Sequence, residues 1–400
     1  MTKIRPHIAI ACGGTGGHIF PGLAVADRLA QRGCEVTVII SNKPVDKIAC
    51  EDIEGVSVVE LSAVAKRKGN LKEFVSALWK SIQTCRGYFK SKKPHAIFAT
   101  GGFVSAAPVI VGKRMGARIF IHESNTIPGK ANRLFSFIAD EVLVGFKCAA
   151  QFFPEKKVRV TGTPVRPDFL KIDRQQCCRR LGFDEKRPTL LVAGGSQGAH
   201  PINELFINSM SLIKEKLAGW QIIHITGKED YEVVEKAYRE SGINARVYSF
   251  CSRMDELLGA ATIAVSRAGA SFLAELSAAR VMPLLIPYPY AADNHQFYNG
   301  LVFVKAGAGR MLEQRKATPE LLIGMILQLS EESDIRSKNI ESLAKLNSIN
   351  AAETVANLII EKVAADLGNS IVFEPRQSIW NQKKEKNVLK PQQSEPIFAK

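Results

Sequence analysis

Several stretches of the sequence combine glycines with side chains that can bind anions or move protons. The first is G-G-T-G-G-H at residues 13–18, directly after the apolar run 7–12. Glycines leave backbone N–H groups uncovered and a helix start adds unpaired ones, so this loop suits a phosphate or diphosphate. His18 would stand at that helix start, where the dipole favours neutral imidazole and hence a general base. A histidine that only caps or packs the helix is an equal alternative.

A second stretch, residues 264–299, offers a more complete ligand site. R-A-G-A at 267–270 predicts a tight turn at a helix start, which again suits a diphosphate, and Glu275 would lie one helical turn later, within reach of a ribose diol. A buried strand at 282–286 precedes D-N-H-Q at 293–296, whose side chains suit sugar hydroxyls. Each loop alone is more often a cap or a surface loop, but two on consecutive units favour a ligand site.

Further loops of this kind follow other expected strands. They are T-G-G at 100–102, H-E-S-N at 122–125, T-G-T-P-V-R at 161–166 and G-G-S-Q-G-A at 194–199. Ser196 could bind a phosphate oxygen and Arg166 could reach a phosphate, although Arg166 could equally be a surface arginine. The backbone near Cys251 follows a strand and could contact a flat base.

The elements that position these loops alternate between strands and helices in both halves of the chain. This alternation predicts an α/β fold with two parallel sheets covered by helices, joined near residues 161–166. We expect an N-terminal domain at 1–163, a C-terminal domain at 164–349, return of the helix 350–366 to the first domain, and a disordered polar tail at 368–400. A dinucleotide oxidoreductase is disfavoured, because residues 13–18 do not fit G-x-G-x-x-G and the strand 35–40 lacks a terminal acid.

Composition narrows the classes of protein. Four hundred residues favour two domains, and eight scattered cysteines without a C-x-x-C pair argue against a disulfide framework or a zinc site. The N-terminus does not fit a signal peptide, and no apolar run is long enough to span a membrane. The net charge of +15 is uneven: residues 1–166 hold 25 Lys and Arg against 12 Asp and Glu. The first half is therefore expected to meet a polyanionic surface.

Residues 64–93 concentrate this positive charge, with nine Lys and Arg against one acid, Glu73. Apolar residues recur at helical spacing, which is typical of a helix at a membrane interface but equally of a helix packed on its own domain. Nucleic acid is not expected, because no recognisable binding module is present. The candidate membrane residues are Lys66, Arg67, Lys68, Leu71, Phe74, Leu78 and Trp79.

The ordered set of these motifs resembles the MurG family of N-acetylglucosaminyltransferases over about residues 5–365. The resemblance implies a GT-B fold, with two facing Rossmann-like domains and a cleft between them. It implies transfer of N-acetylglucosamine from UDP-N-acetylglucosamine to the C4 hydroxyl of an undecaprenyl-diphosphate-linked muramyl-pentapeptide, with inversion. The enzyme would serve peptidoglycan synthesis as a peripheral protein on the cytoplasmic face of the bacterial inner membrane.

The resemblance also implies roles for individual residues. His18 is the candidate base, and Gly14, Thr15, Gly16 and Gly17 would cradle the acceptor diphosphate. The donor would be bound by Thr15, Gly16, Gly17, Asn125, Arg166, Ser196, Cys251, Ala270, Ser271, Glu275 and Gln296. No cofactor is expected, because there is no D-x-D motif, although a weakly held divalent ion stays open.

Some positions depart from the family pattern. They are Ser124, Thr163, Phe272 and the run 251–253, which bring single contacts into question. Rival functions are a UDP-N-acetylglucosamine 2-epimerase, another UDP-sugar transferase, or a non-catalytic protein that binds nucleotide sugars or nucleic acid. An epimerase would need neither a lipid acceptor nor a membrane helix.

Overall fold

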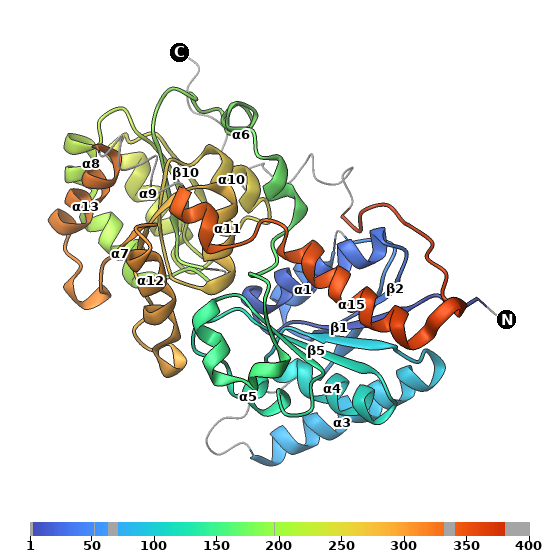
Figure 1. The fold of residues 1–400 in the computed structure, drawn as a ribbon. Coiled ribbons are helices and arrows are strands. Elements are labelled where there is room, and N and C mark those ends of the chain that lie inside the picture. The colour runs from blue at the N-terminus through green and yellow to red at the C-terminus, as the bar shows by residue number, and fades with distance from the viewer. Residues whose placement is uncertain (1–2, 52, 63–70, 196, 332–340, 381–400) are drawn as a thin grey trace. The chain divides into compact units, whose positions relative to one another are not determined.

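A computed structural model describes residues 3–51, 53–62, 71–195, 197–331 and 341–380. The chain forms two compact units (Figure 1). Unit 1 comprises residues 1–167, 270–274 and 346–381, and unit 2 comprises 168–269, 275–345 and 382–400. The predicted basic residues 66–68 and the predicted phosphate ligand Ser196 lie outside the described residues.

Unit 1 is built on a seven-stranded sheet in the order β3-β2-β1-β4-β5-β6-β7, in which every neighbouring pair is parallel. The strands are β1 (His7–Ala11), β2 (Glu35–Ser41), β3 (Ser57–Leu61), β4 (Ala96–Ala99), β5 (Arg118–Glu123), β6 (Glu141–Val144) and β7 (Val158–Val160). The central strands are buried along their length, as expected for a parallel sheet covered on both faces.

Helices cover both faces of this sheet. They are α1 (Gly16–Gln31), α2 (Pro44–Cys50), α3 (Leu71–Ser91), α4 (Ala106–Arg114), α5 (Lys130–Phe135) and α15 (Ala351–Leu367). One core joins Ile8 and Ile10 of β1 to α1 and α15, and the other joins Ala9 and Ala11 to α3 and α4. Alternate residues of β1 thus enter opposite cores, and Figure 1 shows the two helix pairs on opposite sides of the sheet.

Unit 2 repeats the plan with a six-stranded parallel sheet in the order β10-β9-β8-β11-β12-β13. Its strands are β8 (Thr189–Ala193), β9 (Gln221–Ile225), β10 (Ala245–Tyr248), β11 (Ile263–Ser266), β12 (Met282–Leu285) and β13 (Arg310–Met311). Its helices are α6 (Arg174–Leu181), α7 (His200–Asn208), α8 (Met210–Lys216), α9 (Tyr231–Ser241), α10 (Met254–Ala260), α12 (His295–Lys305) and α13 (Pro319–Glu331). Helix α11 (Ala270–Ala279) begins with residues 270–274, which are grouped with unit 1, and continues in unit 2 from Glu275. The predicted pair of parallel α/β sheets is confirmed.

The segment after α15 differs from the prediction of a disordered tail, which is wrong for residues 371–380. Ile371 forms a parallel bridge with Ile4, and Trp380 forms an antiparallel bridge with Ile53. Ile379 is 1% exposed, and its N–H donates to a carboxylate oxygen of the buried Asp27 at 2.9 Å. The polar composition of this segment predicted disorder. Backbone hydrogen bonds and one buried apolar side chain nevertheless hold it against unit 1. We call residues 371–380 the strap.

Candidate functional site

The glycine loop of unit 1 lies at the carboxyl end of β1. Gly13 and Gly14 have φ of +149° and +90°, and α1 begins at Gly16 after the extended Thr15. Asp46, fully buried at the start of α2, accepts the Gly14 N–H at 2.7 Å and the Ser41 N–H at 3.1 Å. A Cβ at Gly13 would come within 2.4 Å of the same carboxylate. Asp46 therefore fixes the conformation of the glycine loop. The backbone N–H groups in the first turn of α1 have no partner within the helix and can bind an anion.

His18 and the T-G-G loop meet beside this glycine loop. The Thr100 hydroxyl donates to the carbonyl of His18 at 2.9 Å. A Cβ built on Gly102, whose φ is +73°, would lie 3.3 Å from Cδ2 and 3.6 Å from Nε2 of the His18 ring. A glycine at 102 thus lets the backbone approach the imidazole, and the first turn of α1 holds the histidine next to the loop that could bind an anion.

The H-E-S-N loop is organised by a buried carboxylate that sequence reasoning missed. Glu123, 2% exposed, accepts two bonds from Asn125, from its backbone N–H at 2.9 Å and its amide nitrogen at 3.0 Å. It also accepts the Gly129 N–H and the Asn132 amide, both at 2.9 Å. These bonds satisfy the buried charge and fix the half-buried Asn125 in one orientation. An acid at the end of a buried strand was the available signal.

His122 links this loop to the T-G-T-P-V-R segment. Its Nε2–H donates to the carbonyl of Gly162 at 2.9 Å, because a carbonyl oxygen can only accept. Burial lowers the pKa of His122, so the ring is held neutral. Arg166, at the end of the segment, is 5% exposed and its guanidinium lies 5.0 Å from the centre of the Phe20 ring. Arg166 is therefore buried and not a free surface arginine.

The β8 loop of unit 2 is shaped by glycines in close packing. A Cβ at Gly198, whose φ is +77°, would stand 2.0 Å from the carbonyl oxygen of Thr226. A Cβ at Gly194 would stand 2.4 Å from the amide nitrogen of Ala199, the residue that precedes α7. The loop is thus pressed against the loop that follows β9, and both follow adjacent strands of the sheet.

Arg267 joins the loop after β11 to the loop after β12, and sequence reasoning missed it too. It is 8% exposed and donates to the carbonyl of Ile286 at 3.0 Å and to the side-chain oxygen of Gln314 at 2.7 Å. Its guanidinium lies 5.5 Å from the centre of the Tyr288 ring. Burial lowers the pKa of Arg267 to about 10, which leaves it charged at neutral pH. The positive group therefore holds two loops of the candidate donor site together.

The other predicted donor residues follow strands β10, β11 and β12. Ala270 and Ser271 are the first residues of α11, and Glu275 follows in the same helix with 7% exposure. Gln296 accepts the backbone N–H of Tyr288 at 3.0 Å, and Cys251 is buried after β10. Because all five positions come after the carboxyl ends of β10, β11 and β12, the sheet brings them to one edge.

The polar run at 293–296 has an unusual backbone. Asp293 and Asn294 both occupy the left-handed region, with φ of 50° and 53°. Such conformations cost energy in residues other than glycine and concentrate at ligand sites. The neighbouring Asn299 is fully buried and donates to the carbonyl of Ala268 at 3.1 Å, which ties α12 to the R-A-G-A turn.

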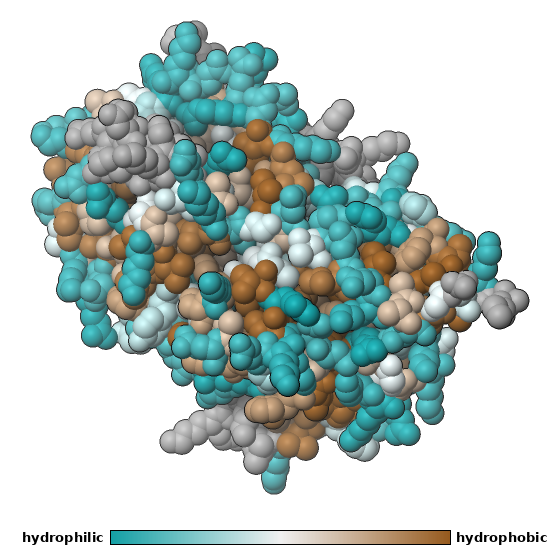
Figure 2. Space-filling model, viewed as in Figure 1, coloured by the Kyte–Doolittle hydropathy of each residue, from teal (hydrophilic) through white to brown (hydrophobic). Residues whose placement is uncertain are grey.

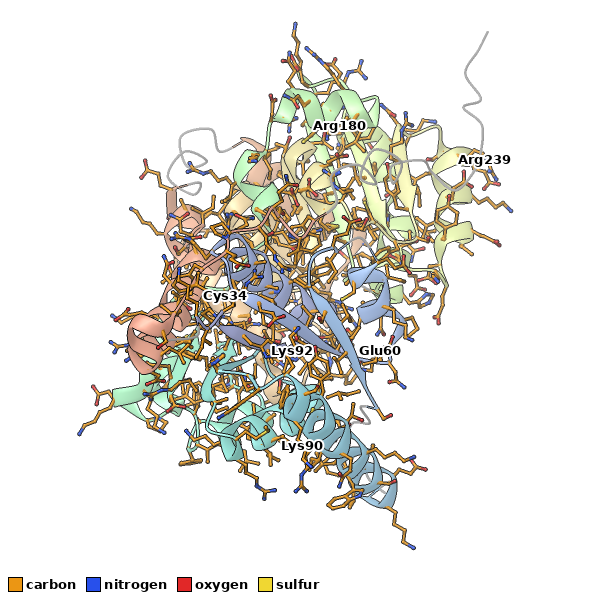
Figure 3. The ribbon with its side chains drawn as sticks, turned by 90° about the vertical axis from the view of Figure 1, so that its right-hand side faces the viewer. Cys34, Glu60, Lys90, Lys92, Arg180 and Arg239 are labelled. Carbon is orange, nitrogen blue, oxygen red and sulfur yellow. The ribbon has the colours of Figure 1, made fainter. Side chains whose placement is uncertain are left out.

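The candidate membrane residues on helix α3 lie partly in the interior and partly on the surface. Trp79 and Val75 are 62% and 54% exposed, whereas Leu78 is half-buried against the core and Phe74 lies 4.7 Å from the Phe103 ring. Figure 3 shows the end of α3 opposite Lys90 projecting from the rest of unit 1. Lys92, just beyond α3, pairs with Glu35 of β2 at 3.0 Å and so anchors the inner end. Leu71 is the first residue of α3.

Within the described ranges, no cluster of three His, Cys, Asp or Glu side chains could hold a metal ion. None of the helices that the structure describes is both long enough and apolar enough to cross a bilayer.

Comparison with known protein families gives two matches. The model of the glycosyltransferase family 28 N-terminal domain matches residues 8–144, and that of the C-terminal domain matches residues 189–357. Together the two matched ranges cover most of the chain.

Similar proteins carry one recurring name. A protein of Geotalea daltonii is 32% identical over 363 residues, which is 88% of this chain and 96% of that protein. A protein of Gloeothece citriformis is 33% identical over 370 residues, 90% of this chain and 97% of that protein. Both are named UDP-N-acetylglucosamine--N-acetylmuramyl-(pentapeptide) pyrophosphoryl-undecaprenol N-acetylglucosamine transferase.

Solved structures with a similar fold carry more than one name. The crystal structure of MurG from Acinetobacter baumannii is similar with a TM-score of 0.68 and 25% identity, covering 89% of this chain and 99% of that one. A UDP-N-acetylglucosamine 2-epimerase, described as putative, from Listeria monocytogenes has a TM-score of 0.67 at 12% identity, covering 94% and 100%. The second likeness is one of fold alone.

Proposed function

This chain belongs to glycosyltransferase family 28 and, within it, to the MurG family, and from this premise we propose how its two units share the reaction. It has the GT-B fold and is a UDP-sugar-dependent N-acetylglucosaminyltransferase of peptidoglycan synthesis. It transfers N-acetylglucosamine from UDP-N-acetylglucosamine to a muramyl-pentapeptide carried on undecaprenyl diphosphate.

Unit 2, together with the first turn of α11, is proposed to bind the donor. The R-A-G-A turn supports this, because α11 begins there and its first amides at Ala270 and Ser271 can receive a diphosphate. Glu275 would bind the ribose diol and Gln296 the sugar hydroxyls, with the backbone at Cys251 beside the uracil. Ser196, on the neighbouring β8 loop, would be a further phosphate ligand.

Unit 1 is proposed to bind the acceptor and to supply the base. Thr15, Gly16 and Gly17 would bind the acceptor diphosphate through their amides at the start of α1. Gly14 would shape the loop, because its own N–H donates to Asp46. Asn125 would hold the sugar and Arg166 would stand near the donor diphosphate.

The proposed chemistry is an inverting displacement. His18 takes the proton from the C4 hydroxyl while that oxygen attacks the anomeric carbon and the bond to UDP breaks. The observation that carries this role is the packing of the His18 ring on Gly102, next to the loop at the start of α1. No cofactor enters this scheme.

Contact with the membrane is proposed for α3. The acceptor named for the relatives carries an undecaprenyl chain, and the exposed Val75 and Trp79 offer apolar groups on a helix that also bears Lys72 and Lys80. The basic residues 66–68 directly precede this helix in the sequence. The enzyme would then be a peripheral protein on the cytoplasmic face of the inner membrane.

The deciding experiment measures release of UDP from UDP-N-acetylglucosamine with and without a lipid-linked muramyl-pentapeptide. We expect release only with the acceptor, together with a disaccharide product. Release without acceptor, accompanied by a 2-acetamido epimer, would indicate an epimerase instead. Absence of turnover in both reactions would contradict an enzymatic role.

A further inference from the structure

The surface at the end of α5 carries apolar side chains that the structure leaves exposed. We call Leu134, Phe137, Ile138 and Phe152 the α5 patch. Leu134 and Phe137 are 65% and 73% exposed, and Ile138 and Phe152 are 39% and 37% exposed. Figure 2 shows hydrophobic residues at the surface in the area of α5, with hydrophilic residues around them. Exposed apolar groups at this density mark an interaction surface.

The backbone brings these side chains to one face. Helical hydrogen bonding continues past α5, since the Ser136 N–H donates to Asn132 and the Ala139 N–H donates to Phe135. Positions 134, 137 and 138 are therefore three and four residues apart on one side of the turn. Phe135 points the other way and is buried in the core of unit 1, which fixes the face that the patch presents.

Cations border the patch. The Arg133 guanidinium lies 5.2 Å from the centre of the Phe152 ring, and Lys157 Nζ donates to the carbonyl of Phe137 at 2.9 Å. Lys130 is exposed one turn before Leu134 on the same helix.

Among the acids near the patch, the exposed Glu155 is followed directly by Lys156 and Lys157, and Asp140 and Glu141 are engaged with other cations. Asp140 pairs with Lys113 and Arg118, at 3.0 Å and 3.4 Å. Glu141 pairs with Arg159 and Lys362, at 3.4 Å and 3.3 Å. The border of the α5 patch therefore keeps a positive charge that an anionic partner can neutralise.

From this combination we infer that the α5 patch inserts into the headgroup region of an anionic bilayer, as a membrane contact separate from α3. Apolar side chains enter the interface while the bordering cations bind lipid phosphates. The inference rests on the proposed function, because that function places the acceptor in a membrane. The contact would also restrict motion at the H-E-S-N loop. The N–H of Gly129, which precedes α5, donates to Glu123, and Glu123 also accepts the N–H of Asn125.

A protein partner fits the patch less well. Stable protein interfaces involve roughly 20–30 residues on each side. The α5 patch has four apolar side chains on a short helix and a turn. A bilayer needs no matching shape and gains from each inserted side chain separately.

The test is sedimentation of the full chain with vesicles made of equal parts phosphatidylcholine and phosphatidylglycerol. The double variant Leu134→Ser/Phe137→Ser should lower the vesicle partition coefficient by roughly tenfold or more, given the apolar area withdrawn. The matched control Val233→Ser/Leu321→Ser removes exposed apolar groups of unit 2, which are 61% and 43% exposed, and should leave partitioning unchanged. Equal partitioning of the α5 variant and the parent protein overturns the inference.

Two further measurements separate the possible failures. Turnover of an acceptor analogue with a short, water-soluble chain should be the same in the parent protein and the α5 variant. If the parent protein itself fails to turn it over, the proposed function fails, whereas the inference is judged by vesicle binding alone. If the α5 variant instead abolishes a concentration-dependent dimer and leaves vesicle binding intact, the patch is a self-association surface and the inference is wrong.

A conservative variant guards against misfolding. Phe137→Trp keeps a large apolar group in place, and the fluorescence that it adds in a Trp79→Phe background should be quenched by vesicles that contain brominated lipids. The fluorescence that Leu321→Trp adds in the same background should not be quenched. Equal quenching of the two added tryptophans would overturn the inference.

Discussion

At the residue scale, His18 provides the most direct test of the proposed chemistry. His18→Ala should lower kcat by about 10²–10⁴-fold, the usual contribution of a general base, and leave KM for UDP-N-acetylglucosamine nearly unchanged. The change is small in volume and leaves the Thr100 bond intact, since that bond uses the backbone carbonyl. His200→Ala is a suitable control, because the side chain of His200 is 74% exposed in unit 2. Steady-state kinetics with a kcat near that of the parent protein would remove His18 from the mechanism.

His224 makes a second residue-scale prediction, about pH and stability. The ring is fully buried; Tyr238 donates to its Nδ1 and its Nε2–H donates to Asn203, since the Asn203 amide nitrogen already donates elsewhere. Burial lowers the pKa of His224 to about 3, well below the usual value of a histidine side chain. As pH falls, the unfolded chain takes up the proton first, so the stabilisation is complete above about pH 6.5 and is lost progressively below it.

Between about pH 7 and about pH 4.5, His224 should lower the free energy of unfolding of unit 2 by on the order of 2 kcal/mol. Hydrogen exchange of the β9 amides reports the free energy of opening in unit 2 at each pH. In His224→Gln the pH dependence should be flatter by about this amount. An identical slope in both proteins would show that His224 does not titrate in this range.

At the scale of the element, two glycines of the β8 loop allow backbone strain to be tested with and without a steric clash of the added Cβ. Gly195 and Gly198 have φ of +98° and +77°, so an alanine is strained at either position. A Cβ at Gly198 would meet Thr226 at 2.0 Å, whereas a Cβ at Gly195 meets nothing within 4 Å. Gly198→Ala should therefore displace the loop and raise KM for the donor by roughly tenfold or more, about 1.4 kcal/mol of binding. Gly195→Ala should raise it much less, and equal effects on KM would argue against a donor loop set by this contact.

Elements also show which features could be predicted from sequence. Strand and helix alternation and the glycine loops depend on local periodicity and turn chemistry, so both sheets and the loops at their strand ends could be predicted. The α3 stripe could not be resolved, because helical spacing alone does not tell Leu78, which packs inward, from Trp79, which is exposed. Asp46 and Glu123 were missed because their role is to accept backbone and amide N–H groups from residues that only the fold brings near.

At the scale of the whole molecule, the strap shows how one peripheral segment can stabilise a complete unit. It reaches three separate parts of unit 1, through bonds of Val372 to Ile4, of Ile379 to Asp27 and of Glu54 to Ile379. Asp27 belongs to α1, whose first turn carries His18. The strap therefore holds the same helix that positions the candidate base, but at its other half.

A chain that ends at residue 370 should consequently have a less stable unit 1 and an unchanged unit 2. Its Asp27 carboxylate would lose the Ser378 and Ile379 donors, and the apolar surface under Ile379 would be exposed. Loss of two bonds to a charged group and one buried side chain predicts a decrease in the free energy of unfolding of roughly 4–9 kcal/mol. Ser378→Ala removes one donor and should cost about 1.5–3 kcal/mol. Hydrogen exchange of β1 and β9 amides distinguishes the two units, and a change in β9 protection equal to that in β1 would contradict a stabilising role confined to unit 1.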